Sequence, residues 1–165
     1  MKSKIENMLQ PTIQYTHERK LIGARVTMCL SINKTSELWR RFLLNRKYIS
    51  HPLSEEVISM ALYPKDYFTR FEATKQFDKW AAVEVSQLEA VPPGLETFVL
   101  PAGRYAVFDY KGPSNDPSIF QYIFSTWLPA SPYILDDRPH FEVLGEKYRN
   151  NDPASEEQIW IPVKA

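Results

Sequence analysis

The chain has 165 residues, enough for one domain with a sizeable core and no need of crosslinks. Its 20 basic and 20 acidic residues cancel, which argues against a broad electrostatic attraction to nucleic acid or an anionic membrane. The one cysteine, Cys29, excludes an internal disulfide framework and suits a reducing compartment. The N-terminal residues lead into no apolar signal region, and no apolar run approaches the length of a membrane span, so we expect a cytoplasmic protein.

The first half of the chain reads as strand, helix, strand, strand. Residues 11–30 have an extended pattern, and Asn33 or Thr35 then supplies an N-cap for a helix that carries Leu38, Trp39, Phe42 and Leu43. The segments 56–64 and 79–85 read as strands, joined by a loop that contains Tyr67 and Phe68. Residues 91–94, Val-Pro-Pro-Gly, break the chain.

The second half repeats this order. Residues 98–110 form an interrupted strand, and Asp116-Pro117 begins a helix whose apolar stripe runs to Leu128 before Pro129 ends it. Strands near 139–144 and 158–163 follow. The pattern predicts an α+β domain with an antiparallel sheet, built as a duplicated unit that leaves a cleft about a pseudo-two-fold axis. We assign residues 1–10 to an N-terminal extension and 11–165 to the domain, with halves at about 11–90 and 95–165.

Catalytic signatures are largely missing. The sequence has no dinucleotide-binding or Walker glycine loop, no H-E-x-x-H and no G-x-S-x-G elbow, and it predicts no cofactor. His17, His51 and His140 have no ligand spacing, so we expect surface or strand-end residues rather than a metal site. Aromatic residues make up 13% of the chain, which indicates either a heavy core or a pocket with aromatic walls.

Glu84 and Glu142 lie inside apolar, strand-like runs and are the candidates for a carboxylate in a cleft. Strand alternation places Glu84 on the same face as Trp80, where it is either a solvated glutamate or a cleft residue that binds a cation beside an indole. In the last strand, Ile159, Ile161 and Val163 form a core face. The opposite face carries Gln158 and Trp160, with Trp160 either packed under a helix or lining a pocket.

Four segments occur in an order that resembles a known family: Leu100–Phe108, Trp127-Leu128-Pro129, Pro139–Val143 and Gln158–Val163. Together they resemble the GyrI-like superfamily, also called the AraC-type effector-binding domain, over about residues 11–164. The resemblance implies two SH2-like βαββ halves around a central pocket that binds hydrophobic or cationic compounds in bacterial proteins. In that family the domain is often fused to a DNA-binding regulator, some members stand alone, and some of those are hydrolases.

The resemblance also implies an acidic residue just before the apolar-aromatic-apolar-Pro run, where this chain has Gln158. An amide supplies neutral hydrogen bonds and no general base, so this substitution favours a neutral aromatic ligand over a cation or hydrolysis. The chain after residue 11 is used by the domain, which leaves no room for a helix-turn-helix, and we expect no direct contact with nucleic acid.

We therefore predict a stand-alone small-molecule-binding domain related to transcription regulation and multidrug binding. Its candidate ligand-binding residues are Trp39, Trp80, Glu84, Tyr105, Trp127, Phe141, Gln158 and Trp160. Helix-face packing is the alternative for Trp39 and Trp127. One rival function is a hydrolase in which a pocket glutamate such as Glu84 activates water and Tyr105 donates a proton. A second is a protein-interaction module that binds a topoisomerase or a partner regulator, and a homodimer also stays open.

Overall fold

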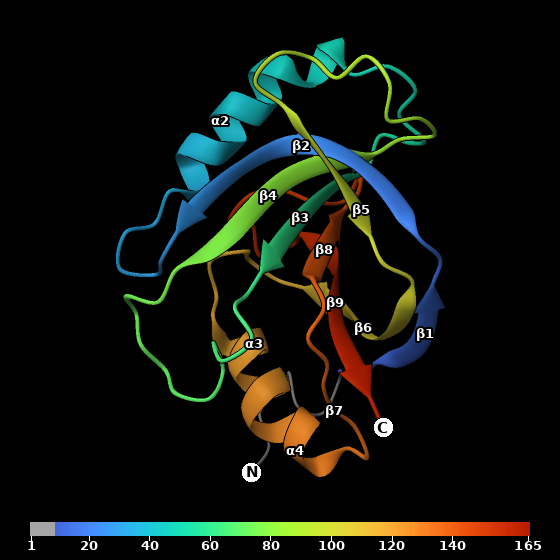
Figure 1. Ribbon diagram of the computed structural model, residues 1–165. Helices are drawn as coiled ribbons and strands as arrows, with labels where there is room; N and C mark the ends of the chain where they lie inside the picture. Colours follow the sequence, from blue (N-terminus) through green and yellow to red (C-terminus); the bar gives the residue numbers. More distant parts are fainter. Residues whose placement is uncertain (1–8) are drawn as a thin grey trace.

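The described residues, 9–165 of a computed structural model, form one antiparallel sheet with helices at two places along it (Figure 1). The strand order is β1-β6-β9-β8-β3-β4-β2-β5, and the short β7 pairs with β9. The strands are β1 (Thr12–Thr16), β2 (Arg19–Met28), β3 (Val57–Leu62), β4 (Phe77–Glu84), β5 (Glu96–Leu100), β6 (Gly103–Lys111), β7 (Ile134–Leu135), β8 (His140–Leu144) and β9 (Glu156–Lys164). The helical segments are α2 (Thr35–Asn45), η1 (Arg46–Tyr48), α3 (Ser118–Tyr122), η2 (Ile123–Trp127) and α4 (Leu128–Ala130).

The predicted α+β class and antiparallel sheet are confirmed, and the strands fall close to where the sequence pattern places them. The interrupted strand over 98–110 is in fact two strands, because Pro101-Ala102 separates β5 from β6 and the two pair with different partners. β5 pairs with β2, whereas β6 lies between β1 and β9. The prediction that Pro129 ends the second helix is off by one residue, since α4 runs to Ala130.

The helices begin where side chains satisfy free backbone N–H groups. Asn33 Oδ1 accepts a hydrogen bond from the Thr35 N–H at 2.9 Å, and Asp116 Oδ1 accepts one from the Ser118 N–H at 2.9 Å. η2 is a π-helical turn, in which the Leu128 N–H bonds to the Ile123 carbonyl one residue further back than in an α-helix. The sequence predicts both helices in the right place but misses each N-cap by one residue, since the N-caps are Lys34 and Pro117.

The sheet has two different faces because side chains alternate along each strand. The helical face carries one cross-strand row, Ala81–Ser59–Glu142–Ile159–Phe108. At one end of the sheet α2 packs against β2 and β4, and at the other α3 and η2 pack against the side chains of β6 and β9. The opposite face carries the row Trp80–Met60–Phe141–Trp160–Val107, whose members share one buried core cluster made of strand residues. We call this second face the strand-only face.

Candidate functional site

A cavity of about 570 Å³ lies on the helical face, over the middle of the sheet. It opens there because β3 and β8 lie between the two helical ends and β3 carries only small side chains, Ser59 and Ala61, toward the middle of this face. The segment between β3 and β4 lines it with Tyr63, Tyr67 and Phe68, and the α3–η2 helical segment lines it with Phe120, Gln121 and Phe124. The fold therefore leaves a hollow of the size of a small-molecule site at the centre of the sheet.

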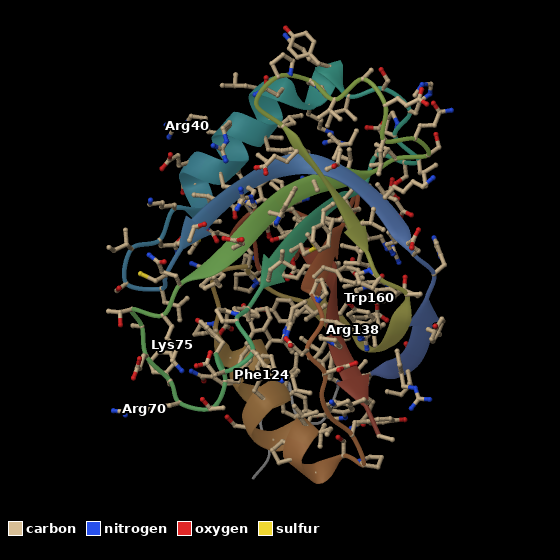
Figure 2. All side chains as sticks on the ribbon, in the orientation of Figure 1. Arg40, Arg70, Lys75, Phe124, Arg138 and Trp160 are labelled. Atoms are coloured by element: carbon tan, nitrogen blue, oxygen red, sulfur yellow. The ribbon has the colours of Figure 1, made fainter. Side chains whose placement is uncertain are left out.

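Aromatic rings make up much of the wall. Phe68, Phe124 and His140 form a cluster of three rings, in which the Phe68 centroid lies 5.4 Å from each of the other two and those two lie 6.1 Å apart. Tyr63 lies 4.9 Å from Phe68 and 5.0 Å from Phe77, again between ring centroids. Phe124 extends from the helical segment toward the strands in Figure 2. Such flat faces suit planar aromatic ligands, and their quadrupoles suit cations.

Two carboxyl groups and one ammonium group line this apolar cavity, and one of the carboxyls, Glu72, is exposed and pairs with Arg70. Glu142 of β8 is half-buried, and burial raises the pKa of its carboxyl above the ordinary value. Lys79 of β4 lies on the same face and its charge acts in the opposite direction on that pKa. Burial lowers the pKa of His140 to about 3, so the imidazole is neutral at physiological pH and serves as an aromatic wall.

The structure brings two of the eight predicted ligand-binding residues, Phe141 and Trp160, to the edge of this cavity. Their rings, however, belong to the strand-only face, where they stack on each other with centroids 5.0 Å apart. Trp80 and Tyr105 lie in the same core cluster, and the Tyr105 hydroxyl donates to the Pro139 carbonyl at 2.7 Å. These four rings thus pack together in the core of the strand-only face, on the other side of the sheet from most of the cavity.

Trp39 and Trp127 lie on helices, half-buried against the core clusters at opposite ends of the sheet. Trp39 packs edge-on against Phe42, with ring centroids 5.7 Å apart, and Trp127 packs in the same way against Phe108 at 5.2 Å. Neither lines the cavity. Their positions agree with the alternative of helix-face packing.

Glu84 lies on the strand-only face with Trp80, as alternation predicts. Its carboxylate, however, already has a cationic partner, the side chain of Arg19. Arg19 Nη1 pairs with Glu84 Oε1 at 3.2 Å. The Arg19 guanidinium carbon lies 5.1 Å from the ring centroid of Trp160 and 5.3 Å from that of Phe141. The sequence suggested a ligand cation between Glu84 and Trp80, whereas in the structure Glu84 pairs with Arg19, which lies against Trp160 and Phe141.

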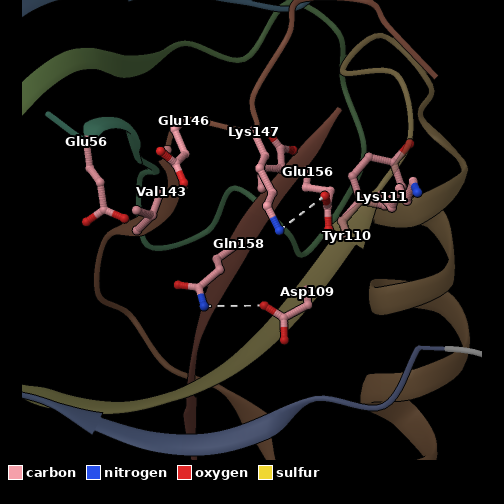
Figure 3. Close-up of a pocket in the computed structure, with 11 residues that line it drawn as sticks. Glu56, Asp109, Tyr110, Lys111, Val143, Glu146, Lys147, Glu156 and Gln158 are labelled. Carbon is pink, nitrogen blue, oxygen red and sulfur yellow. Dashed lines mark hydrogen bonds and ion pairs between the residues drawn. The ribbon is translucent and has the colours of Figure 1, made fainter. Parts of the chain in front are cut away.

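Gln158 lines a different hollow, a charged outer cleft of about 500 Å³ at one end of the sheet (Figure 3). Its Nε2 donates to Asp109 at 3.3 Å, and its Oε1 accepts from the Trp160 indole N–H at 3.3 Å. The amide therefore fixes Trp160 from the strand-only face. Its lack of charge does not bear on the charge of the aromatic cavity.

Sequence reasoning missed the residues that form most of the wall. The loop with Tyr67 and Phe68 was expected only as a connection, and His140 as a surface or strand-end residue; it is the first residue of β8 but is buried. A signal was present, since Tyr63, Tyr67, Phe68 and Phe71 place four aromatic rings in nine residues of one loop. Aromatic side chains at that density in a connection are typical of a binding surface.

Residues 9–165 contain no group of three or more His, Cys, Asp or Glu side chains placed to hold a metal ion. Within the same part of the chain, no helix has the length and apolar character needed to cross a membrane.

This sheet with its central cavity defines an effector-binding domain, and comparisons with known proteins agree. The family model of the integron-associated effector-binding protein Cass2 matches residues 12–163. The transcriptional regulator BrlR of Pseudomonas aeruginosa is 30% identical over 131 residues, which cover 77% of this chain and 45% of the regulator. This chain thus spans less than half of that relative.

Two solved structures share the fold. The C-terminal domain of EcmrR has a TM-score of 0.71 and 13% identity, with 95% of this chain and 98% of that one covered. The structure of SAV2435 bound to tetraphenylphosphonium has a TM-score of 0.67 and 16% identity, with 94% of both chains covered. The chain belongs to the Cass2 family of integron-associated effector-binding proteins.

Proposed function

We propose that this protein captures aromatic cations in the cavity on the helical face, with Glu142 as the counter-charge. The observation that carries this proposal is a half-buried carboxyl on the floor of a cavity of about 570 Å³ walled by aromatic rings. Ring faces and a carboxylate both attract a cation, and each acts more strongly where water is excluded. The size fits a compound of several rings.

Two further points support a cationic ligand over a neutral one. The SAV2435 structure, which shares the fold, contains the aromatic cation tetraphenylphosphonium. The sequence favours a neutral ligand because Gln158 stands where the family has an acidic residue. Gln158, however, lines the outer cleft. The charged residues that line the cavity are Glu142, Lys79 and the exposed Glu72, which already pairs with Arg70.

The test is a titration with tetraphenylphosphonium, followed by thermal shift, beside tetraphenylborate, an anion of the same shape. We expect the cation to stabilise the protein increasingly with concentration, and the anion to have a much smaller effect. Glu142→Gln should weaken cation binding about tenfold or more, which corresponds to about 1.4 kcal/mol.

The matched control is Glu89→Gln, which removes an exposed carboxylate outside the cavity and should leave binding unchanged. Equal stabilisation by the cation and the anion, or full cation affinity in Glu142→Gln, contradicts the role of Glu142. Absence of any shift with the cation contradicts the proposed ligand class.

We also infer that the domain is a duplicated pair of SH2-like βαββ units related by a pseudo-two-fold axis, as the sequence pattern predicts. The segments β2-α2-β3-β4 and β6-α3-β8-β9 each run strand, helix, strand, strand, with the short β7 as an addition. In the sheet, β6-β9-β8 meets β3-β4-β2, so corresponding strands lie at corresponding distances from the β8–β3 boundary. The proposed ligand site lies over that boundary.

A further inference from the structure

Two carboxyl groups, those of Glu142 and Glu157, are neighbours on the helical face of the sheet. Glu142 of β8 pairs across the sheet with Ile159 of β9, so Glu157, two residues from Ile159, lies diagonally beside Glu142 on the same face. Each carboxyl raises or lowers the pKa of the other, as expected of close neighbours. Glu157 is 9% exposed, and its Oε2 has no N–H or O–H donor from the described residues.

This proximity favours a proton on the pair. Two ionised carboxylates side by side in a region of low dielectric constant repel each other strongly. One proton removes this repulsion, and a protonated carboxyl gains a hydrogen-bond donor that an ionised one lacks. The pair of Glu142 and Glu157 is therefore most stable with one proton and one negative charge.

The groups facing the pair come from every neighbouring element. Lys79 of β4 provides a positive charge that acts on both carboxyls, and the neutral His140 lies two residues before Glu142 on β8. Three phenols are further neighbours: Tyr63 after β3, Tyr110 of β6 and Tyr148 before β9. The other ionisable side chains that line the outer cleft with Glu157 are Glu56, Asp109, Lys111, Glu146, Lys147 and Glu156. Burial and the neighbouring Glu142 raise the pKa of Glu157 to about 8, so the shared proton is present at neutral pH.

We propose that this pair is a proton-exchange site, in which a cation that enters the cavity replaces the proton shared by Glu142 and Glu157. The proposal rests on the proposed function and adds its regulation by pH. Before binding, the pair carries one proton and a charge of −1; afterwards it carries −2 beside the cation, and one H⁺ has gone to solvent. Charge balances on both sides.

The two carboxyls belong to different hollows, which gives the proton a route of its own. Glu142 lines the aromatic cavity, whereas Glu157 lines the outer cleft of Figure 3. That cleft carries solvent-exposed acceptors, among them Glu146 and Glu156. A ligand that fills the cavity therefore does not block the departure of the proton.

The test is calorimetry of tetraphenylphosphonium binding to the whole chain in two buffers with different ionisation enthalpies. Near pH 6.5 we expect release of close to one proton per cation bound, and almost none above about pH 9. The affinity should rise by up to about tenfold per pH unit on approaching pH 8 and then level off, because proton and cation compete for the pair.

The variant Glu157→Gln distinguishes proton exchange from simple electrostatic attraction of the cation by Glu142. Its amide keeps the size of the carboxyl but has no proton to lose, so binding should persist, release no proton and show a flat pH dependence. Glu89→Gln should behave as the wild type. Binding by the wild type without proton release overturns the exchange and leaves the proposed function standing, whereas no binding at all overturns both.

A second measurement needs neither a variant nor a ligand. In the wild-type protein labelled at glutamate Cδ, one carboxyl should titrate near pH 8 in its ¹³C shift. If every glutamate has already lost its proton by about pH 6, the pair holds no proton at neutral pH and the proposal is wrong.

Discussion

The guanidinium of Arg19 lies over the indole of Trp160, with its central carbon 5.1 Å from the ring centroid, on the strand-only face of the sheet. Its Nη1 pairs with Glu84 and its Nε donates to Thr16 Oγ1 at 3.0 Å. Arg19 and Glu84 are only 16% and 18% exposed in their side chains. The cation, the carboxylate and the indole thus form one partly buried unit that joins β2, β4 and β9.

Removing this cation should weaken the fold. Arg19→Ala leaves Glu84 without its partner and uncovers the faces of Trp160 and Phe141, so we expect the free energy of unfolding to fall by about 1–3 kcal/mol. Urea unfolding followed by tryptophan fluorescence measures this. Arg40, which lies on the outer side of α2 (Figure 2), provides the control. A loss in Arg40→Ala as large as that in Arg19→Ala would contradict the assignment.

The hydroxyl of Tyr105 stabilises the fold through a buried hydrogen bond. It donates to the Pro139 carbonyl at 2.7 Å in a buried position, and it does not line the aromatic cavity. We expect Tyr105→Phe to cost about 1–2 kcal/mol of stability, because the buried carbonyl loses its donor. Tyr15→Phe, at a side chain that is 75% exposed, should have no measurable effect on thermal unfolding.

Gly23 permits a close approach of β2 to β4. A Cβ at this position would lie 2.2 Å from the backbone oxygen of Ala81, which has no freedom to move aside. Gly23→Ala should therefore destabilise the protein by about 1–3 kcal/mol, as overpacking does. At Gly145 the nearest atom to such a Cβ is Glu56 Oε2 at 3.6 Å, an ordinary contact, so Gly145→Ala should unfold at nearly the wild-type urea concentration.

His140 should make stability depend on pH on the acidic side. Burial lowers its pKa from 6.5 to about 3, so the folded state resists protonation while the unfolded state accepts a proton below pH 6.5. Its contribution is complete above pH 6.5 and is lost as pH falls toward 3, by up to about 1.4 kcal/mol per pH unit. In His140→Phe this part of the slope between about pH 6.5 and 5 should vanish. An unchanged slope would show that His140 is protonated in the folded protein.

Phe68 should control access to the cavity. It is 44% exposed, yet it stacks on both Phe124 and His140 across the cavity wall. Phe68→Ala should weaken tetraphenylphosphonium binding about tenfold, with little effect on thermal stability, because an exposed ring contributes more to the ligand than to the core. Tyr48→Ala removes an exposed ring outside the cavity and should bind the cation as the wild type does.

Alternation along single strands predicted much of the fold. Ile159, Ile161 and Val163 are almost completely buried and form the core face that the sequence indicates. The positions of both helix starts follow, to within one residue, from the local hydrogen bonds of Asn33 and Asp116. These features depend on residues close together in the sequence.

The site depends on contacts that a single strand does not determine. Alternation places Glu142 on a face but does not show that Ser59 of β3 lies beside it, or that Glu157 of β9 lies diagonally next to it. Trp160, predicted as a pocket wall, lines the edge of the cavity, while its ring also lies under Arg19. Only the order and register of distant strands decide which carboxylate lies in the cavity and which already has a partner.

The exchange of edge strands ties the two halves of the sequence together. β1 precedes β2 in the chain yet pairs with β6, while β5 precedes β6 yet pairs with β2. A chain cut between residues 90 and 95 would leave each fragment holding the edge strand that the other needs, with backbone groups unpaired on both. The two fragments are thus complementary. A compound held over the β8–β3 boundary would contact both fragments and would therefore favour their reassembly.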